Sequence, residues 1–290
     1  TTGFATQIVN LDGYIENKGF ELSLNAALIS KGDFSWNTMF NISWNENIVK
    51  GIPENTKIFS TFLQNGGGNM QITKNDLPLA SFWGWNSEGV DPQTGDLIFT
   101  DNDGDGTITA EDKQVIGNPM PDFTYGFTNK VSYKNFDLNI VIDGVYGNDI
   151  YNNGKQNLES MRFPENQSAD IVNRWRNPGD ISDIPRVTVV DSNNNGGINS
   201  RWVEDGSFLR VRDISLSYNF ENNITEKLKV SGLSIYANLK NWFTFTDYSG
   251  YSPEVNRSLG GVDSVALTQG VDYGSYPQAK TLTLGLNVEF

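Results

Sequence analysis

The chain has 290 residues, a formal net charge of −14, and neither cysteine nor histidine. These absences exclude disulfide bonds, a histidine-based catalytic triad and a zinc site with histidine ligands, and the acidic balance argues against a nucleic-acid partner, whose phosphates require lysine and arginine. No apolar run approaches the ~20 residues that a membrane-spanning helix needs.

Alternation of apolar and polar side chains predicts seven long strands, after a polar loop over Thr1–Asn17. Side chains of a strand alternate between its two faces with a period of two, so each run has one apolar and one polar face. Most runs have about 11 residues, the length that a tilted membrane strand requires. The predicted strands are Gly19–Ile29, Phe34–Asn45, Phe123–Tyr133, Phe136–Tyr146, Ser207–Phe220, Leu233–Phe245 and Lys280–Phe290.

The last predicted strand shows the pattern most clearly. Leu282, Leu284 and Leu286 alternate with threonine and glycine, and the strand ends on Phe290. An apolar face toward lipid and a polar face toward a wet lumen is typical of a transmembrane β-barrel. One strand departs from this phase, because Leu209 and Val211 fall opposite the alternation of its later residues. We expect either a β-bulge there or a strand end above the membrane.

The connections between the predicted strands alternate between short and long. The short ones have about 4, 2 and 11 residues, whereas Glu46–Asp122, Gly147–Asp205 and Thr246–Pro277 have about 77, 60 and 32. Outer-membrane barrels place short turns at one end and long extracellular loops at the other. We expect these loops to be irregular, apart from a short helix over Ser168–Arg176 that Ser168 caps.

Aromatic side chains gather at both ends of the predicted strands, as the two interfacial girdles of a barrel would. An odd number of strands leaves an open edge, whose unpaired backbone groups lipid does not tolerate. We therefore expect the chain to be the C-terminal part of a larger barrel. The two predicted girdles are Tyr133, Phe136, Tyr218, Phe220 and Phe290, and Trp44, Tyr146, Trp242, Phe243 and Phe245.

One chemical motif stands out in the first long loop. Residues 101–112 fit a twelve-residue calcium loop, with carboxylates at positions one, three, five and twelve and a glycine at position six. The predicted Ca²⁺ ligands are Asp101, Asp103, Asp105 and Asp112 with side-chain oxygens and Thr107 with its carbonyl. The motif ends on aspartate and follows a strand-like segment, so we expect a structural staple of an extracellular loop. A solvated turn rich in aspartate and asparagine is the alternative.

Together these segments resemble the C-terminal portion of the SusC/RagA-like TonB-dependent transporters of Bacteroidota. The segments that carry the resemblance, in family order over nearly the whole chain, are Asn17–Leu22, Asp101–Pro121, Arg174–Gly179, Phe208–Arg212, Asn241–Glu254 and the terminal aromatic strand. The signal peptide, N-terminal domain, TonB box and plug of that family have no counterpart here, so this chain alone would not transport.

The resemblance implies about seven strands of a 22-stranded barrel in the outer membrane, surrounded by lipid and completed by the transporter's remaining strands. It implies a SusD-like lipoprotein lid, coupling to TonB through the plug, and import of oligosaccharides or, for some members, peptides. The long loops would contact the lid or the substrate. Five aromatic side chains in these loops could stack on sugars, but we prefer to interpret them as loop cores or lid contacts. They are Trp83, Trp85, Trp175, Trp202 and Tyr248.

A second function class stays open on sequence alone. A secreted, calcium-stabilised all-β carbohydrate-binding or adhesin module would also have alternating strands and an acidic loop. It would stay folded without detergent, because its apolar side chains would meet across a dry double layer. We do not expect an enzyme, and we interpret the acidic pairs Glu204–Asp205 and Asp180/Asp183 as solvated faces.

Overall fold

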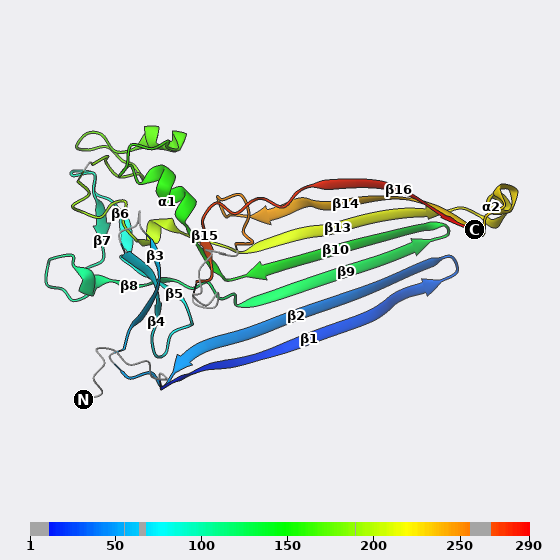
Figure 1. Ribbon diagram of the computed structural model, residues 1–290, viewed down its shortest axis with the longest axis horizontal. Helices are drawn as coiled ribbons and strands as arrows, with labels where there is room; N and C mark the ends of the chain where they lie inside the picture. The colour runs from blue at the N-terminus through cyan, green and yellow to red at the C-terminus, as the bar shows by residue number, and fades with distance from the viewer. Residues whose placement is uncertain (1–11, 55, 64–67, 189, 256–267) are drawn as a thin grey trace, which may run out of the picture.

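Seven strands form one antiparallel sheet in the computed structural model, which describes residues 12–54, 56–63, 68–188, 190–255 and 268–290 (Figure 1). Neighbours in the sheet follow one another along the chain, and short connections lie at one end and long ones at the other. The predicted antiparallel all-β fold is confirmed. The strands are β1 (Tyr14–Lys31), β2 (Phe34–Lys50), β9 (Phe123–Tyr133), β10 (Phe136–Tyr146), β13 (Phe208–Asn219), β14 (Gly232–Thr246) and β16 (Thr281–Glu289).

The first hairpin is longer than its alternation predicts. Strand β1 begins at Tyr14, which pairs with Lys50 at the end of β2. Polar side chains extend the pairing, because Asn17 Oδ1 accepts hydrogen bonds from Asn45 (3.3 Å) and Asn47 (2.8 Å). The predicted loop over 1–17 is therefore wrong for its last four residues, and residues 1–11 lie outside the described part of the chain.

The irregular phase of β13 is a β-bulge, as predicted. Pairing with β10 passes from Asp213 opposite Val141 to Val211 opposite Ile142, which leaves Arg212 as the extra residue. An extra residue shifts the alternation by one position. The bulge therefore returns Val211 and Leu209 to the apolar face of the sheet.

The apolar side chains form a continuous face across the sheet. Directly opposed residues of antiparallel strands project from the same face. Leu284 on this face is 73% exposed, and within the described residues no second sheet is paired or packed over it. One row of opposed residues crosses all seven strands, namely Ile29, Trp36, Val131, Leu138, Leu216, Ala237 and Leu284.

Aromatic rings meet at both ends of this face. At the short-turn end the ring centroids of Phe136 and Tyr218 lie 4.8 Å apart, and those of Tyr218 and Phe220 5.1 Å. Near the long connections the rings of Phe123 and Tyr146 stack at 4.9 Å. The sheet thus carries aromatic clusters at the two levels where the sequence places its girdles.

The long connections are not the irregular loops that the sequence predicts. They contain three small sheets, formed by β3 (Ile58–Leu63), β4 (Gly68–Thr73), β5 (Ser81–Gly84) and β8 (Gln114–Gly117), by β6 (Ser87–Val90) and β7 (Leu97–Phe99), and by β11 (Asp149–Asn152), β12 (Val203–Asp205) and β15 (Val271–Asp272). Strand β7 is the strand-like segment that the sequence predicts before the acidic loop, whereas the others are too short for alternation to reveal them. We call the described residues of the three long connections the outer module.

The helices are short. The outer module contains α1 (Asn153–Glu159) and the 3₁₀ helices η1 (Ala110–Asp112), η2 (Ala169–Asn173) and η3 (Ser200–Trp202), and α2 (Asn222–Leu228) lies in the third short connection. The Ser168 hydroxyl caps η2 as predicted, but this helix ends at Asn173, before the predicted boundary. No helix in the described part of the chain has the length and apolar character needed to cross a membrane.

All three long connections contribute to one hydrophobic core in the outer module. The first supplies Met70 and Phe82, the second Tyr151 and Trp202, and the third Val271. Each of these side chains is at most 1% exposed. Distant segments are therefore fixed relative to one another at the end of the sheet, and they position the candidate sites described below.

Candidate functional site

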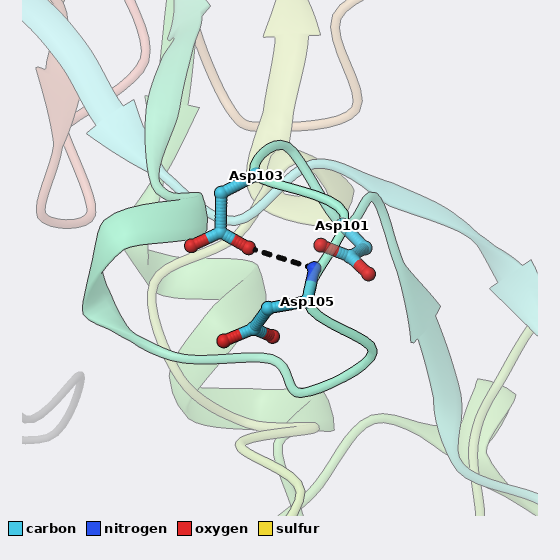
Figure 2. A group of neighbouring side chains, drawn as sticks. All are labelled: Asp101, Asp103 and Asp105. Atoms are coloured by element: carbon cyan, nitrogen blue, oxygen red, sulfur yellow. Dashed lines mark hydrogen bonds between the residues drawn. The ribbon is translucent and has the colours of Figure 1, made fainter.

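Three of the predicted calcium ligands lie together in the loop after β7. Carboxylate oxygens of Asp101, Asp103 and Asp105 lie within 4.8 Å of one another (Figure 2). The side chains of Asp103 and Asp105 are exposed, and Asp101 is half-buried. Carboxylate oxygens at this spacing are the donors that Ca²⁺ binds.

Glycines and backbone amides shape this loop. Gly104 and Gly106 adopt φ values of +73° and +83°, a conformation that glycine takes without steric cost. Their amides donate to the two oxygens of Asp101, at 2.7 and 2.9 Å. The amide of Asp105 donates to Asp103 at 3.1 Å (Figure 2). The loop thus folds around its own carboxylates.

The fourth predicted carboxylate, Asp112, lies outside this group and has a different set of partners. Its side chain is buried and accepts hydrogen bonds from the amides of Asn102 at 2.9 Å and Thr109 at 2.7 Å. Together with the Thr109 hydroxyl, it forms a capping box at η1. Asp112 therefore closes the loop through the backbone. The Thr107 amide donates to Asp105 at 2.7 Å.

The electrostatics of the two kinds of aspartate differ. The amide of Asp105 lowers the pKa of Asp103, but desolvation and the charges of Asp105, Asp112 and Asp101 outweigh it, so the net pKa is raised. At Asp112 the hydrogen bond from the Thr109 amide outweighs burial and lowers the pKa. A cation at the cluster would relieve the repulsion around Asp103.

An aromatic side chain fastens the loop to the outer module. Trp85 Nε1 donates to the carbonyl of Thr109 at 2.7 Å, and the Lys113 ammonium lies 4.1 Å from the Trp85 ring centroid. Burial lowers the pKa of Lys113. Trp85 therefore anchors the loop, which agrees with the preferred interpretation of a loop contact.

Most of the aromatic residues considered as sugar-stacking faces are buried. Trp202, Tyr248 and Trp175 are 0%, 5% and 9% exposed, so they belong to the interior of the outer module. Trp83 lies beneath the Lys57 ammonium at 5.5 Å. The side chain that the sequence analysis missed is Tyr251, which is 79% exposed. Tyr251 lies within the segment Asn241–Glu254 that carries the resemblance, but no alternation surrounds it.

A charged network on the polar face of the sheet was also missed. Arg212, the bulge residue, makes two 2.7 Å hydrogen bonds to the carboxylate of Asp143 and one of 3.3 Å to Glu254. Arg210, which is 2% exposed, pairs with Glu254 and donates to Thr244 at 3.1 Å. This network fastens the start of the third long connection to strands β10 and β13. In the sequence, the presence of two arginines within this one strand was the feature that could have indicated the network.

Glu204 is not the solvated carboxylate that the sequence analysis predicts. Its side chain is 14% exposed and lies 3.0 Å from the Lys155 ammonium. It also accepts hydrogen bonds from the Ser249 amide and hydroxyl, both at 2.9 Å. Burial raises the pKa of Glu204, but these hydrogen bonds and the lysine outweigh it and lower the pKa.

Known proteins resemble this chain in sequence. No protein-family model matches it. It is 36% identical over 309 aligned positions to TonB-dependent receptor P3 of Formosa agariphila, and 28% identical over 300 to TonB-dependent receptor SusC of Bacteroides thetaiotaomicron. Each alignment covers 100% of this chain but only 30% and 28% of the relative. The chain thus spans about 30% of the length of the curated relatives it matches.

Solved structures agree in fold. The RagAB peptide transporter superposes with a TM-score of 0.79 at 22% identity, over 100% of this chain and 31% of that one. The 'open-open' state of the RagAB peptide importer gives 0.74 at 20% identity, over 96% of this chain and 29% of that one. In sequence and in fold the chain is therefore similar to a segment of the SusC/RagA-like TonB-dependent receptors that spans about 30% of their length.

Proposed function

We propose that the chain forms part of the wall and outer surface of an outer-membrane importer for nutrient oligomers, with oligosaccharides as cargo rather than peptides. The row of opposed apolar residues from Ile29 to Leu284 carries this proposal. A monomeric soluble protein seldom exposes so large a contiguous apolar face, whereas lipid stabilises such a face on a barrel. The apolar face would therefore meet hydrocarbon.

The second function class, a secreted module, finds no support in this arrangement. Such a module would bury Leu22, Leu216 and Leu284 against a second layer, yet they are 43%, 46% and 73% exposed. The buried core lies in the outer module instead. We also infer a transport role without catalysis, because the relatives are named as receptors.

The proposed importer needs parts that this chain does not supply. Strands β1 and β16 form the two outer edges of the sheet, and each pairs on one side only among the described residues. Unpaired strand edges do not persist in lipid, so the remaining barrel strands would pair with both edges. We further propose TonB and a SusD-like surface lipoprotein as partners, the latter resting on the outer module.

Deletion of the full transporter gene tests this proposal. Growth on an oligosaccharide that the host consumes should stop, growth on the matching monosaccharide should continue, and restoring the gene should rescue uptake. The full protein should fractionate with the outer membrane. Normal growth on oligosaccharides with lost growth on peptides would refute the proposed cargo, and recovery in the soluble fraction would refute the membrane location.

We also propose a structural Ca²⁺ ion in the extracellular loop. The donor set supports it, since three carboxylates converge and Thr107 offers a carbonyl. Asp101, Asp103, Asp105 and Thr107 would hold the ion, while Asp112 keeps its capping partners. The ion would stabilise the loop by neutralising adjacent charges.

Metal analysis of the full transporter tests this second proposal. One Ca²⁺ should remain per transporter after gel filtration, and Asp103→Asn combined with Asp105→Asn should remove it and make residues 101–112 protease-sensitive. Asp180→Asn, in another loop of the outer module, is the matched control. Equal calcium content and equal protease resistance in both variants would refute the site.

A further inference from the structure

A pocket of about 370 Å³ opens between helix α1, the turn before η2 and the third long connection. Pockets for small ligands span roughly 300–1,000 Å³, so this one would hold a short part of an oligomer. Its lining includes Lys155, Leu158, Glu159, Asp170, Tyr251 and Asp272. It lies outside the acidic loop and serves no role described so far.

The charged groups in the floor of the pocket are already paired. Asp272, which is 2% exposed, accepts hydrogen bonds from the Tyr248 hydroxyl at 2.6 Å and from two backbone amides. Glu159 lies 2.6 Å from Arg201. Lys155 pairs with Glu204 at 3.0 Å, behind the lining. Each of these charged side chains therefore already interacts with an opposite charge or with backbone donors, and none is left to bind a charged ligand.

The rim of the pocket is different in character. Tyr251 is 79% exposed and Leu158 is 46% exposed, so the rim offers an aromatic and an aliphatic surface. Asp170 is exposed and accepts from the Ser168 hydroxyl at 2.9 Å. An apolar surface beside hydroxyl, ammonium and carboxylate groups offers both donors and acceptors to a ligand.

We infer that this pocket is a subsite for one or two units of a neutral oligosaccharide, with Tyr251 as the ring on which a sugar stacks. Sugar hydroxyls donate and accept, and the apolar face of a sugar ring can lie on an aromatic ring. The lining carries three carboxylates and one lysine that is already paired, which disfavours sulfated or carboxylated sugars. The inference deepens the proposed import of oligosaccharides and rests on it.

Calorimetric titration of the full transporter tests the subsite. The probes are maltohexaose, cellohexaose, xylohexaose and laminarihexaose, with a carrageenan hexasaccharide as the sulfated comparison. Tyr251→Ala should weaken binding of whichever neutral probe the wild type binds by about tenfold, as the loss of one stacking contact predicts. Tyr251→Phe should bind like the wild type. Tyr276→Ala is the matched control, because Tyr276 is 94% exposed and lies outside the pocket lining.

Each outcome bears on the inference. Unchanged affinity in Tyr251→Ala, with a wild type that binds a neutral probe, refutes the subsite and leaves oligosaccharide import intact. A wild type that binds only the sulfated probe refutes the stated ligand class but not oligosaccharide import. A wild type that binds none of these probes refutes the subsite, while the growth test above decides the proposed cargo separately. If the Tyr251→Ala transporter does not assemble, Asp170→Asn takes its place as the test. This variant should weaken binding at least threefold, and a smaller effect would refute the subsite.

Discussion

The sheet and the outer module are built on opposite principles, although one chain forms both. The outer module buries Phe82, Tyr151 and Trp202 completely, as a water-soluble domain does. The sheet leaves Leu282, Leu284 and Leu286 56%, 73% and 61% exposed. Hydrophobic residues therefore mark an interior in one region and a solvent-facing surface in the other.

This difference shows that the medium determines what apolar burial means. Burial stabilises the module because apolar surface leaves water. The sheet gains the same kind of stabilisation only if hydrocarbon replaces water on its outer face. Substitutions in the module should therefore act equally in detergent and in bilayers, whereas substitutions on the apolar face should depend on the lipid.

The largest effect should follow removal of a core side chain in the module. Trp202→Ala should destabilise the outer module by about 3–5 kcal/mol, because a large cavity replaces a side chain that is 0% exposed. Urea denaturation of the full transporter, followed by proteolysis of the module, measures this loss in detergent and in bilayers.

Ile181→Ala is the control for that experiment, because Ile181 lies in the same connection and is 88% exposed. It should change stability by less than about 0.5 kcal/mol. A Trp202→Ala effect that appears in bilayers but not in detergent would contradict the view that the module is stabilised like a soluble domain.

A charge on the apolar face should have the next largest effect. Leu284→Arg should cost about 2–4 kcal/mol near the middle of the bilayer. Thr283→Arg, on the polar face of the same strand, should cost much less. Guanidinium unfolding in lipid vesicles measures both, and the cost of Leu284→Arg should fall in detergent. Equal costs for the two variants would show that the apolar face does not meet lipid.

The sheet could be predicted from the sequence because its two faces differ in character. Residues of β9, β10 and β16 alternate between an apolar and a polar face, so the alternation persists along each strand. The mismatch at Leu209 and Val211 even located the bulge. The start of β1 escaped prediction, because Tyr14–Lys18 pairs through polar groups that follow no alternation.

The outer module could not be predicted in this way. Its core combines Met70, Tyr151 and Val271 from three connections, and no local pattern records contacts between residues that far apart. The acidic loop was partly predictable, since ligand spacing brings Asp101, Asp103 and Asp105 together. The role of Asp112 depended on hydrogen bonds to the amides of Asn102 and Thr109, which spacing does not encode.

A smaller effect should distinguish the module by its pH dependence. The pKa of Glu204 is lowered in the folded state, so its charge stabilises the module above the unfolded value of about 4.3 and this contribution is lost as the pH falls through the folded value. Glu204→Gln should therefore destabilise the module by roughly 1.5 kcal/mol at pH 7 and by less at pH 3.5.

Urea titrations of the full transporter at both pH values measure that difference, with Asp180→Asn as a control in another loop. A deficit in Glu204→Gln that stays constant between pH 7 and pH 3.5 would mean that its charge does not stabilise the module.

The smallest effect should come from a helix cap in the module. The Ser168 hydroxyl accepts a hydrogen bond of 3.2 Å from the Asp170 amide at the start of η2. Ser168→Ala removes this acceptor and should cost about 0.5 kcal/mol, at the low end for such caps because the hydrogen bond is exposed. Ser168→Thr keeps the hydroxyl and should cost less.

Protease cleavage rates within residues 165–175 resolve this local change. These rates should be the same in detergent and in bilayers, because the cap, like the core of the module, depends on contacts within the protein. A cleavage rate for Ser168→Ala that changed with the lipid would link η2 to the sheet and break the separation between the two regions.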